Sequence, residues 1–146
     1  LGRHTYDIFA AYWPHQDGDI ARRFNTVPKY VASRGTPALD WATSTLLDPD
    51  VAAATTELRE RHANVHVIDS LDFVQTLIAS GLYDRLNLWI YPILLGTGKH
   101  VFASGAVPSN LTLIEPAVTS PAGIVFTRYA RADGIPATGD MTPPAT

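Results

Sequence analysis

"VHVIDSLDFVQTLIASGLYDRLNLWIYPIL", residues 65–94, predicts a strand, a helix and a second strand in close succession. Residues 65–68 have the length and composition of a short buried strand. From Leu71 onward the apolar residues recur at helical spacing, and Gly81 is a residue type that ends helices. Residues 86–93 are apolar at nearly every position, which is the pattern of a central strand covered on both faces.

The residues upstream of this stretch predict the same alternation of strand and helix. Residues 29–33 predict a strand, and the order Asp48, Pro49 predicts the start of a helix, with the acid as its cap. A further helix is expected near the beginning of the chain, where Thr5 can act as the cap. Its apolar face comprises Tyr6, Phe9 and Ala10.

Alternating strands and helices over residues 29–94 favour parallel strands joined by right-handed crossovers. Two further strands, "LTLIEPAVTS" and "GIVFTRYARA", are separated by a Pro/Gly turn at residues 120–123 and predict an antiparallel hairpin. We therefore expect an α/β fold, a three-layer α/β/α sandwich with a mostly parallel central sheet and a C-terminal antiparallel hairpin. Residues 1–133 are expected to form one domain and residues 134–146 a flexible tail rich in Pro and Thr.

Composition excludes several classes of function. The chain has 146 residues, a net charge of −3 and 17% charged residues, which argues against nucleic acid or an anionic membrane as the main partner. No cysteine is present, so a disulfide framework and a thiolate metal site are excluded. His62 and His66 have no third ligand nearby in the sequence, and we expect no metal. A cytoplasmic location is compatible with these features.

Three stretches carry a resemblance to a known family: "LGRHTYDIFAAYWP" (1–14), "VPKYVASR" (27–34) and "GLYDRLNLWIYPILLGTGKHVF" (81–102). Together they resemble the dihydrofolate-reductase-like proteins, and most closely the branch named after the C-terminal reductase domain of riboflavin biosynthesis (RibD C-terminal domain-like). The resemblance extends to about Arg131, and the third stretch is the most specific of the three. It implies an NADPH-dependent reductase that transfers hydride to a heterocyclic or imine substrate.

The residue chemistry agrees with a cofactor site at several of these positions. Gly2 lets the backbone approach a phosphate, Arg3 offers a planar fork for the 2′-phosphate of NADPH, and Thr5 brings donors at a helix N-terminus. The resemblance places the following residues on the cofactor side: Gly2, Arg3, His4, Thr5, Ser33, Arg34, Asp69, Ser70 and Leu71. From the residues alone, Thr5 is equally a helix cap, Arg34 a solvated charge, and Lys99 a surface charge.

One pair of residues departs from the family pattern. Resembling proteins usually carry Gly-Gly or Gly-Ser after the strand that is expected to end at Ile68, and the turn holds the cofactor pyrophosphate. This chain has Asp69-Ser70, and either residue could be the cap of the following helix. A carboxylate at Asp69 can cap the following helix, would then occupy the amides that a phosphate needs, and adds a like charge. We expect cofactor binding to be impaired by this pair but not abolished.

The position of "LGRHTY" leads to a further expectation. In the resembling proteins this turn follows a second strand, and the elements ahead of it supply a central strand and part of the substrate pocket. We therefore expect a longer protein, and expect the present residues alone not to form a competent reductase.

The substrate side is less well defined by the sequence. Tyr91, at the end of the apolar strand, is the candidate substrate-side residue, with a packing or dimer-face aromatic as the alternative. The catalytic residue is unknown from the sequence. A homodimer that acts on a small molecule is expected, and the alternative is a non-catalytic relic of the fold that binds a nucleotide or serves as an interaction domain.

Overall fold

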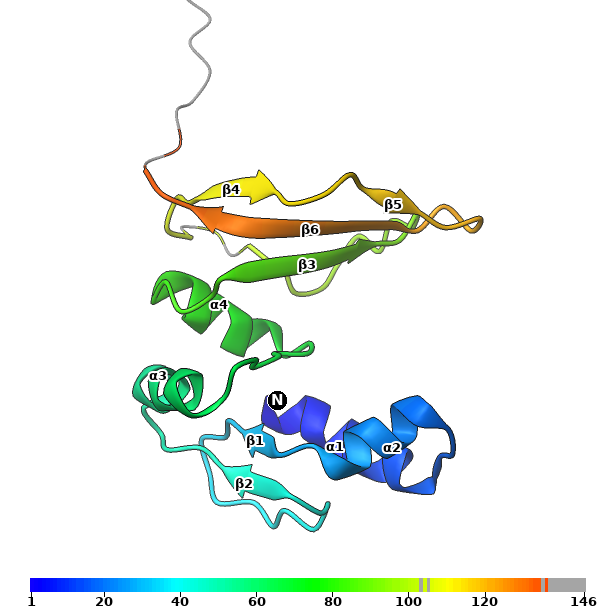
Figure 1. Ribbon diagram of the computed structural model, residues 1–146, viewed down its shortest axis with the longest axis vertical. Helices are drawn as coiled ribbons and strands as arrows, with labels where there is room; N and C mark the ends of the chain where they lie inside the picture. Colours follow the sequence, from blue (N-terminus) through cyan, green and yellow to red (C-terminus); the bar gives the residue numbers. More distant parts are fainter. Residues whose placement is uncertain (103, 105, 135, 137–146) are drawn as a thin grey trace, which may run out of the picture. The chain divides into compact units, whose positions relative to one another are not determined.

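The protein is described by a computed structural model that covers residues 1–102, 104, 106–134 and 136 (Figure 1). It divides into two compact units, one made of Leu1–Leu82 with Lys99–Ser104 and the other of Tyr83–Gly98 with Gly105–Thr146. Each unit holds one of the two sheets. The single domain over residues 1–133 stays a prediction, and most of the expected tail lies outside the described residues.

The first unit begins with helix α1 (Arg3–Tyr12), a 3₁₀ turn (Trp13–His15) and helix α2 (Asp19–Thr26). The N-cap of α1 is Gly2, so the prediction that Thr5 caps this helix is wrong: Thr5 lies inside the first turn and is buried. Helix α2 was not predicted, because Pro14 and the polar residues after it indicated only a break. Its start is made possible by Gly18, whose φ of 99° is a conformation that suits glycine.

An aromatic cluster forms one core of this unit. Tyr6, Val31 and Trp41 are buried at its centre, and α1, the 3₁₀ turn and α2 add Phe9, Trp13 and Phe24 around them. Beside it, the buried ammonium of Lys29 lies 4.3 Å from the centre of the Trp41 ring. The pKa of Lys29 is lowered by this burial, and the ammonium is satisfied by three acceptors, the backbone oxygens of Phe24 and Val27 and the Thr43 hydroxyl.

Strands β1 (Lys29–Val31) and β2 (Ser44–Leu46) pair in parallel, with Lys29 opposite Ser44 and Val31 opposite Leu46. The strand expected over residues 29–33 is thus confirmed in part. On the other edge of β1, Ala32 forms a parallel bridge with Gly2. This bridge places the start of α1 directly beside the end of β1, where the sequence placed two parts of the cofactor site.

Helix α3 (Val51–Arg61) follows β2. Its cap is Asp50, whose carboxylate accepts a hydrogen bond of 3.0 Å from the amide of Ala53, so the helix begins two residues later than the Asp48-Pro49 pattern predicted. Ala54 and Leu58, four residues apart on one face of the helix, are both buried.

Helix α4 (Leu71–Ala79) ends as the sequence predicted. Gly81 has a left-handed φ of 65°, and its amide bonds to the carbonyl of Ile78 at 3.1 Å while the amide of Leu82 bonds to that of Leu77 at 2.9 Å. This pair of bonds closes the helix with a Schellman motif, for which glycine is the favoured residue.

The prediction of a strand over residues 65–68 is wrong. No strand is assigned there, and within the described residues nothing pairs with this segment. Apolar composition alone does not make a strand, because a ladder of hydrogen bonds to a neighbour is also required. Val65 and Ile68 are 39% and 37% exposed, and both line a cavity of about 470 Å³ that also contacts Tyr30 and Leu58.

The second unit is a four-stranded antiparallel sheet (Figure 1). It comprises β3 (Arg85–Ile90), β4 (Asn110–Leu113), β5 (Val118–Thr119) and β6 (Val125–Ala132). Strand β6 pairs with the other three, so the predicted C-terminal hairpin is confirmed. A strand within residues 86–93 is also confirmed, but its observed pairing is antiparallel, with Leu86 opposite Tyr129 and Ile90 opposite Val125.

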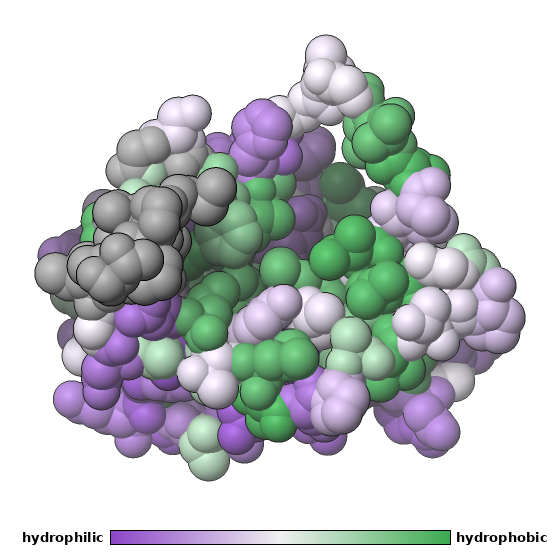
Figure 2. Space-filling view, turned by 90° about the horizontal axis from the view of Figure 1, so that it is seen from above, coloured by the Kyte–Doolittle hydropathy of each residue, from purple (hydrophilic) through white to green (hydrophobic). Residues whose placement is uncertain are grey.

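Burial of β3 differs from the sequence prediction. A central strand covered on both faces was expected, whereas Trp89 is 64% and Ile90 53% exposed, and the sheet order places β3 at an edge. Exposure continues into the segment that follows, where Leu94 and Leu95 are fully or largely open to solvent. Figure 2 shows apolar side chains at the surface of the face it draws. No helix within the described part of the chain is long and apolar enough to cross a membrane.

Candidate functional site

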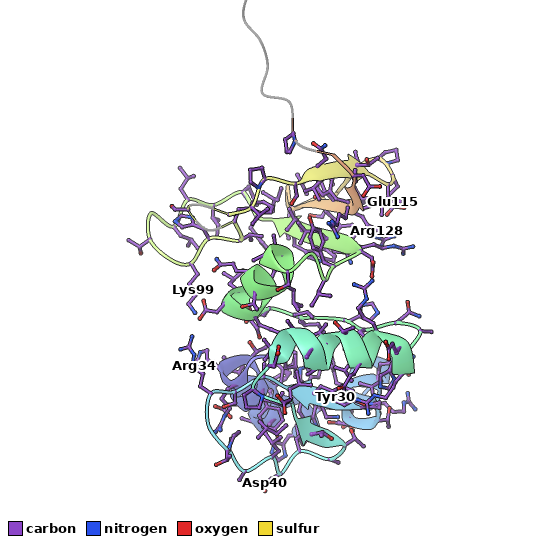
Figure 3. The ribbon with its side chains drawn as sticks, turned by 90° about the vertical axis from the view of Figure 1, so that its left-hand side faces the viewer. Tyr30, Arg34, Asp40, Lys99, Glu115 and Arg128 are labelled. Carbon is purple, nitrogen blue, oxygen red and sulfur yellow. The ribbon has the colours of Figure 1, made fainter. Side chains whose placement is uncertain are left out.

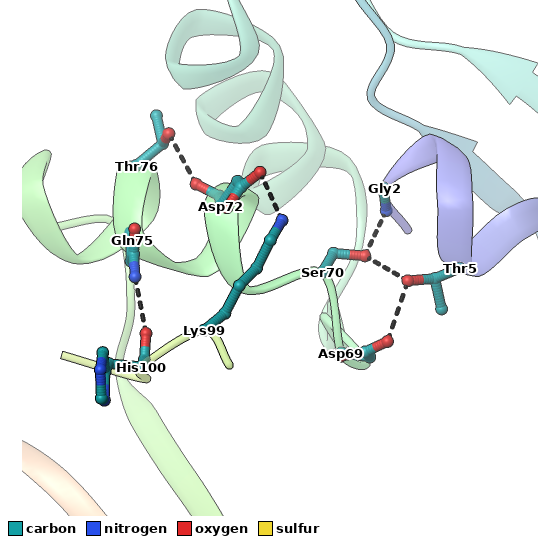
Figure 4. Close-up of polar contacts among 9 residues, drawn as sticks. All are labelled: Gly2, Thr5, Asp69, Ser70, Asp72, Gln75, Thr76, Lys99 and His100. Atoms are coloured by element: carbon teal, nitrogen blue, oxygen red, sulfur yellow. Dashed lines mark hydrogen bonds and ion pairs between the residues drawn. The ribbon is translucent and has the colours of Figure 1, made fainter. Parts of the chain in front are cut away.

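Two turns that are distant in the sequence meet in the first unit (Figure 4). The amide of Gly2 donates to the hydroxyl of Ser70 at 2.6 Å, across 68 residues. The hydroxyls of Thr5 and Ser70 lie 2.9 Å apart, and the Thr5 hydroxyl donates to the Asp69 carboxylate at 3.1 Å. Four of the residues expected on the cofactor side are therefore brought together by direct hydrogen bonds.

The direction of these bonds follows from the hydrogens available. A threonine hydroxyl has one hydrogen, and that of Thr5 goes to Asp69, since an ionised carboxylate can only accept. The hydroxyl of Ser70 must then donate to the oxygen of Thr5 while it accepts from Gly2. The result is a relay that begins at the backbone of Gly2 and ends at the Asp69 carboxylate.

Gly2 is required by the closeness of the two turns. Its φ of −76° is open to any residue, so conformation does not demand glycine here. A Cβ at this position, however, would lie 2.7 Å from the Ser70 hydroxyl oxygen and 2.9 Å from the Ser70 Cβ. The sequence predicted close backbone approach at Gly2, and the structure shows that the approaching group is the turn at Ser70.

The Asp69-Ser70 turn has a left-handed backbone at both residues, with φ of 55° and 64°. Such conformations cost a non-glycine residue about 1 kcal/mol or more. The glycines that resembling proteins carry at this turn avoid that cost. In this chain the relay from Thr5 and Gly2 supplies hydrogen bonds that hold the turn.

Of the two residues expected as the cap of the following helix, Asp69 is wrong and Ser70 has the N-cap position of α4. The side chain of Ser70, however, makes no capping hydrogen bond to the helix. The physical reason is the backbone: a capping side chain needs an extended N-cap residue, and Ser70 is left-handed. In the described structure the amides of Leu71, Asp72 and Phe73 therefore have no side-chain acceptor.

Arg3 lies at the start of α1, next to this turn. Its Nε donates to both carboxylate oxygens of Asp7, at 2.7 and 2.9 Å, and this leaves the two terminal nitrogens without a hydrogen bond in the described structure. The Arg3 amide bonds to the carbonyl of Ala32 at 3.0 Å, which places Ser33 and Arg34 just beyond. His4 is exposed on the same turn of helix.

Lys99, which the sequence alone indicated to be a surface charge, also lies near the N-terminus of α4. The ammonium of Lys99 lies 2.8 Å from the carboxylate of Asp72, in the first turn of α4, and Gln75 donates to the carbonyl of His100 at 2.6 Å (Figure 4). Lys99 and Arg34 lie on the same side of the first unit (Figure 3). Nothing in the sequence paired Lys99 with Asp72, which is 27 residues away.

The charge of Asp72 is set by these cations. The hydrogen bond from Lys99 lowers the pKa of the Asp72 carboxyl below its usual 3.8, and the charge of Lys99 lowers it further. Desolvation raises this pKa by a smaller amount, and the charge of Arg34 has the smallest effect, again to lower it. Asp72 is therefore ionised at neutral pH and its charge is balanced locally. This balance reduces its repulsion toward an anion at the N-terminus of α4.

Tyr91, the candidate substrate-side residue, belongs to the second unit and follows β3 directly. It is 56% exposed, and its carbonyl accepts a hydrogen bond of 2.8 Å from the amide of Ile93. Its role stays a prediction.

The comparison with protein families decides what kind of domain this is. The model of the RibD C-terminal domain matches residues 1–125, most of the chain. The chain belongs to the RibD C-terminal domain family. The resemblance found in the sequence is thus confirmed.

This RibD C-terminal domain is also similar to one relative in sequence and to two solved structures in fold. It is 25% identical to the uncharacterised protein YyaP of Bacillus subtilis over 134 residues, which are 88% of this chain and 70% of YyaP. It matches a chain from Shewanella sp. PV-4, named as a riboflavin biosynthesis protein, with a TM-score of 0.72 at 20% identity, over 90% of this chain and 72% of the other.

The second structure is a pyrimidine reductase-like protein from Corynebacterium diphtheriae. It matches with a TM-score of 0.51 at 18% identity, over 72% of this chain and 50% of the other. At these identities the likeness shows the fold, and the α/β class predicted from the sequence is confirmed. This RibD C-terminal domain has a reductase-type fold.

The donor set at the meeting of the two turns suits a phosphate. It combines uncapped amides at the start of α4 with the open nitrogens of Arg3 and with the cations Arg34 and Lys99. Amides at a helix N-terminus and guanidinium groups are the donors that phosphates prefer. Against it stand the carboxylates of Asp69 and Asp72, of which the first is bonded to Thr5 and the second to Lys99.

Proposed function

We propose that this domain binds NADPH and belongs to a reductase that transfers hydride to a heterocyclic or imine substrate. The observation that carries the proposal is the meeting of Gly2 and Thr5 with the Asp69-Ser70 turn, beside an α4 N-terminus that the side chain of its N-cap residue, Ser70, does not cap. Membership of the RibD C-terminal domain family supports it. The pyrophosphate would lie at the amides of Leu71 and Asp72, and the 2′-phosphate near Arg3 and Arg34.

The residues of the chain would bind and orient, because the cofactor supplies the hydride. Arg3 keeps its orientation through the bond from its Nε to Asp7, so its terminal nitrogens are already directed when a phosphate arrives. Ser33 and His4 are expected to contact the same end of the cofactor. Tyr91 is proposed on the substrate side. A homodimer and a cytoplasmic location remain part of this proposal.

Titration of the protein with NADPH and NADH, followed by nicotinamide fluorescence, tests the proposal. We expect NADPH to bind and NADH, which lacks the 2′-phosphate, to bind at least tenfold more weakly. Arg3→Gln should weaken NADPH by about tenfold, a loss of about 1.4 kcal/mol, and leave NADH unchanged.

Arg22→Gln is the matched control for this substitution. Arg22 is likewise an exposed arginine paired with an aspartate, Asp19, on a helix of the same unit. It should change neither affinity. If the two substitutions had equal effects, or if the two nucleotides bound equally well, the proposal that Arg3 binds the 2′-phosphate would be wrong.

A second candidate function is a non-catalytic interaction domain that has kept the fold. The observation that favours it is the presence of two carboxylates, Asp69 and Asp72, around the proposed pyrophosphate position. The same titration separates the two functions, because the interaction domain is expected to give no fluorescence change with either nucleotide.

A further inference from the structure

We infer that Thr5 is a positioning residue that holds the Asp69 carboxylate away from the first amides of α4, so that those amides stay open to a phosphate. The inference rests on the proposed function for its effect on binding. Its structural part, the link between the Thr5 hydroxyl and the state of the α4 amides, is testable on its own.

The first step is the chemistry of the hydroxyl. Thr5 is only 3% exposed, so its hydroxyl bonds to protein groups rather than to bulk water. It donates to Asp69 and accepts from Ser70, and the Ser70 hydroxyl is fixed in turn by the Gly2 amide. A serine at this position could form both bonds, and a valine of the same shape could form neither.

The second step is that the relay and a helix cap exclude each other. Capping of α4 needs an extended backbone at the N-cap, from which an oxygen reaches the second or third amide of the helix. The relay is seen with Asp69 and Ser70 both left-handed, at φ of 55° and 64°. Without the Thr5 hydroxyl, Asp69 loses its hydrogen bond and Ser70 keeps only the bond from the Gly2 amide. Less then holds the two residues in this costly conformation, and we expect the balance to move toward the extended, capped state.

The third step concerns the ligand. In the capped state a carboxylate or hydroxyl occupies the amides of the first turn of α4, and a phosphate has to displace it. In the relay state the amides are open, and the nearby charge of Asp72 is balanced by Lys99. Thr5 thus controls the phosphate site without any need to contact the ligand.

Four proteins test the inference: Thr5→Val, Thr5→Ser, Asp69→Gly and the double variant Thr5→Val/Asp69→Gly. Glycine adopts a left-handed backbone without strain and has no carboxylate to cap the helix, so it makes the relay unnecessary. We expect Thr5→Val to weaken NADPH binding about tenfold when Asp69 is present. In the double variant, compared with Asp69→Gly alone, the same substitution should weaken binding by less than about twofold. Thr5→Ser should bind NADPH as the unchanged protein does.

A readout that does not depend on the cofactor is amide hydrogen exchange at Leu71, Asp72 and Phe73. Thr5→Val should slow exchange at one or more of these amides, because they become hydrogen-bonded in the capped state, and Asp69→Gly should return them to fast exchange. The matched control is Thr55→Val, which removes the hydroxyl of another threonine, 4% exposed, in the same unit. It should alter neither NADPH affinity nor these amides.

The outcomes separate this inference from the proposed function. If no variant binds NADPH but Thr5→Val still slows the α4 amides, the proposed function fails and the positioning role stands. If Thr5→Val weakens NADPH equally in both backgrounds and leaves the amides unchanged, Thr5 acts on the ligand directly or through stability, and the inference is overturned. Thermal unfolding of each variant excludes a protein that has simply lost its fold.

Discussion

Substitution of Asp69 is the sharpest perturbation of the site, because the residue combines a charge, a strained backbone and a hydrogen bond. Glycine relieves the left-handed strain, worth about 1 kcal/mol, but loses the bond from Thr5 and gains freedom in the unfolded chain, each worth about 1 kcal/mol or less. We therefore expect Asp69→Gly to lower the free energy of unfolding by no more than about 1 kcal/mol.

The affinity for NADPH should change in the opposite direction. A unit charge about 8 Å from a phosphate contributes roughly 2 kcal/mol at an effective dielectric near 20, and salt screening brings this closer to 1.4 kcal/mol. Asp69→Gly should therefore bind NADPH about tenfold more tightly. Calorimetric titration measures the affinity, and urea unfolding measures the stability.

Two neighbouring variants separate the causes. Asn tolerates the left-handed backbone and keeps an oxygen that can accept from Thr5, so Asp69→Asn removes the charge alone. It should raise the affinity with stability unchanged. Ala keeps the strain and loses the bond, so Asp69→Ala should be about 1–2 kcal/mol less stable than the unchanged protein. If all three variants bind NADPH as the unchanged protein does, Asp69 does not face the pyrophosphate and the proposed placement is wrong.

Three further predictions concern the surroundings of the site. Lys29→Met should lower the free energy of unfolding by about 3 kcal/mol, because it leaves three acceptors at 2.8–3.0 Å without their donor; a loss below about 1 kcal/mol in urea unfolding would contradict this. The contact between Lys99 and Asp72 should persist above pH 3.8 and be lost only as the pH falls through the lower pKa of the folded state; a carboxyl titration by NMR that gives the same midpoint in Lys99→Met would refute it. The exposed apolar side chains of Trp89, Ile90 and Leu94 favour a homodimer, and light scattering that shows a monomer at tens of micromolar would exclude it.

Local signals in the sequence were sufficient for much of the fold. Gly81 ended α4 as expected, and the Pro/Gly turn at residues 120–123 joined two antiparallel strands, since both depend on a few adjacent residues. Helix α2 is not evident from the sequence because its apolar residues, Ile20, Ala21 and Phe24, are few among charges. The side that faces the core is shown only by the structure, in which Ala21 is buried and Phe24 contacts Phe9 and Trp13.

Features that depend on a distant partner could not be obtained this way. Residues 65–68 have the composition of a strand, yet a strand also needs a paired neighbour, and the sequence does not state which segment that is. The same holds for the site. Composition placed Asp69 at a helix start and predicted a cap, whereas the hydroxyl of Thr5, 64 residues away, takes the carboxylate instead.

Titration of the unchanged protein with NADPH and with NADH, followed by nicotinamide fluorescence, is the decisive experiment for a cofactor site at the two turns. We expect a saturable change with NADPH and at least tenfold weaker binding of NADH, because the two differ only in the 2′-phosphate, which we propose to lie near Arg3 and Arg34. Absence of any change with NADPH, or equal affinity for both nucleotides, would contradict it.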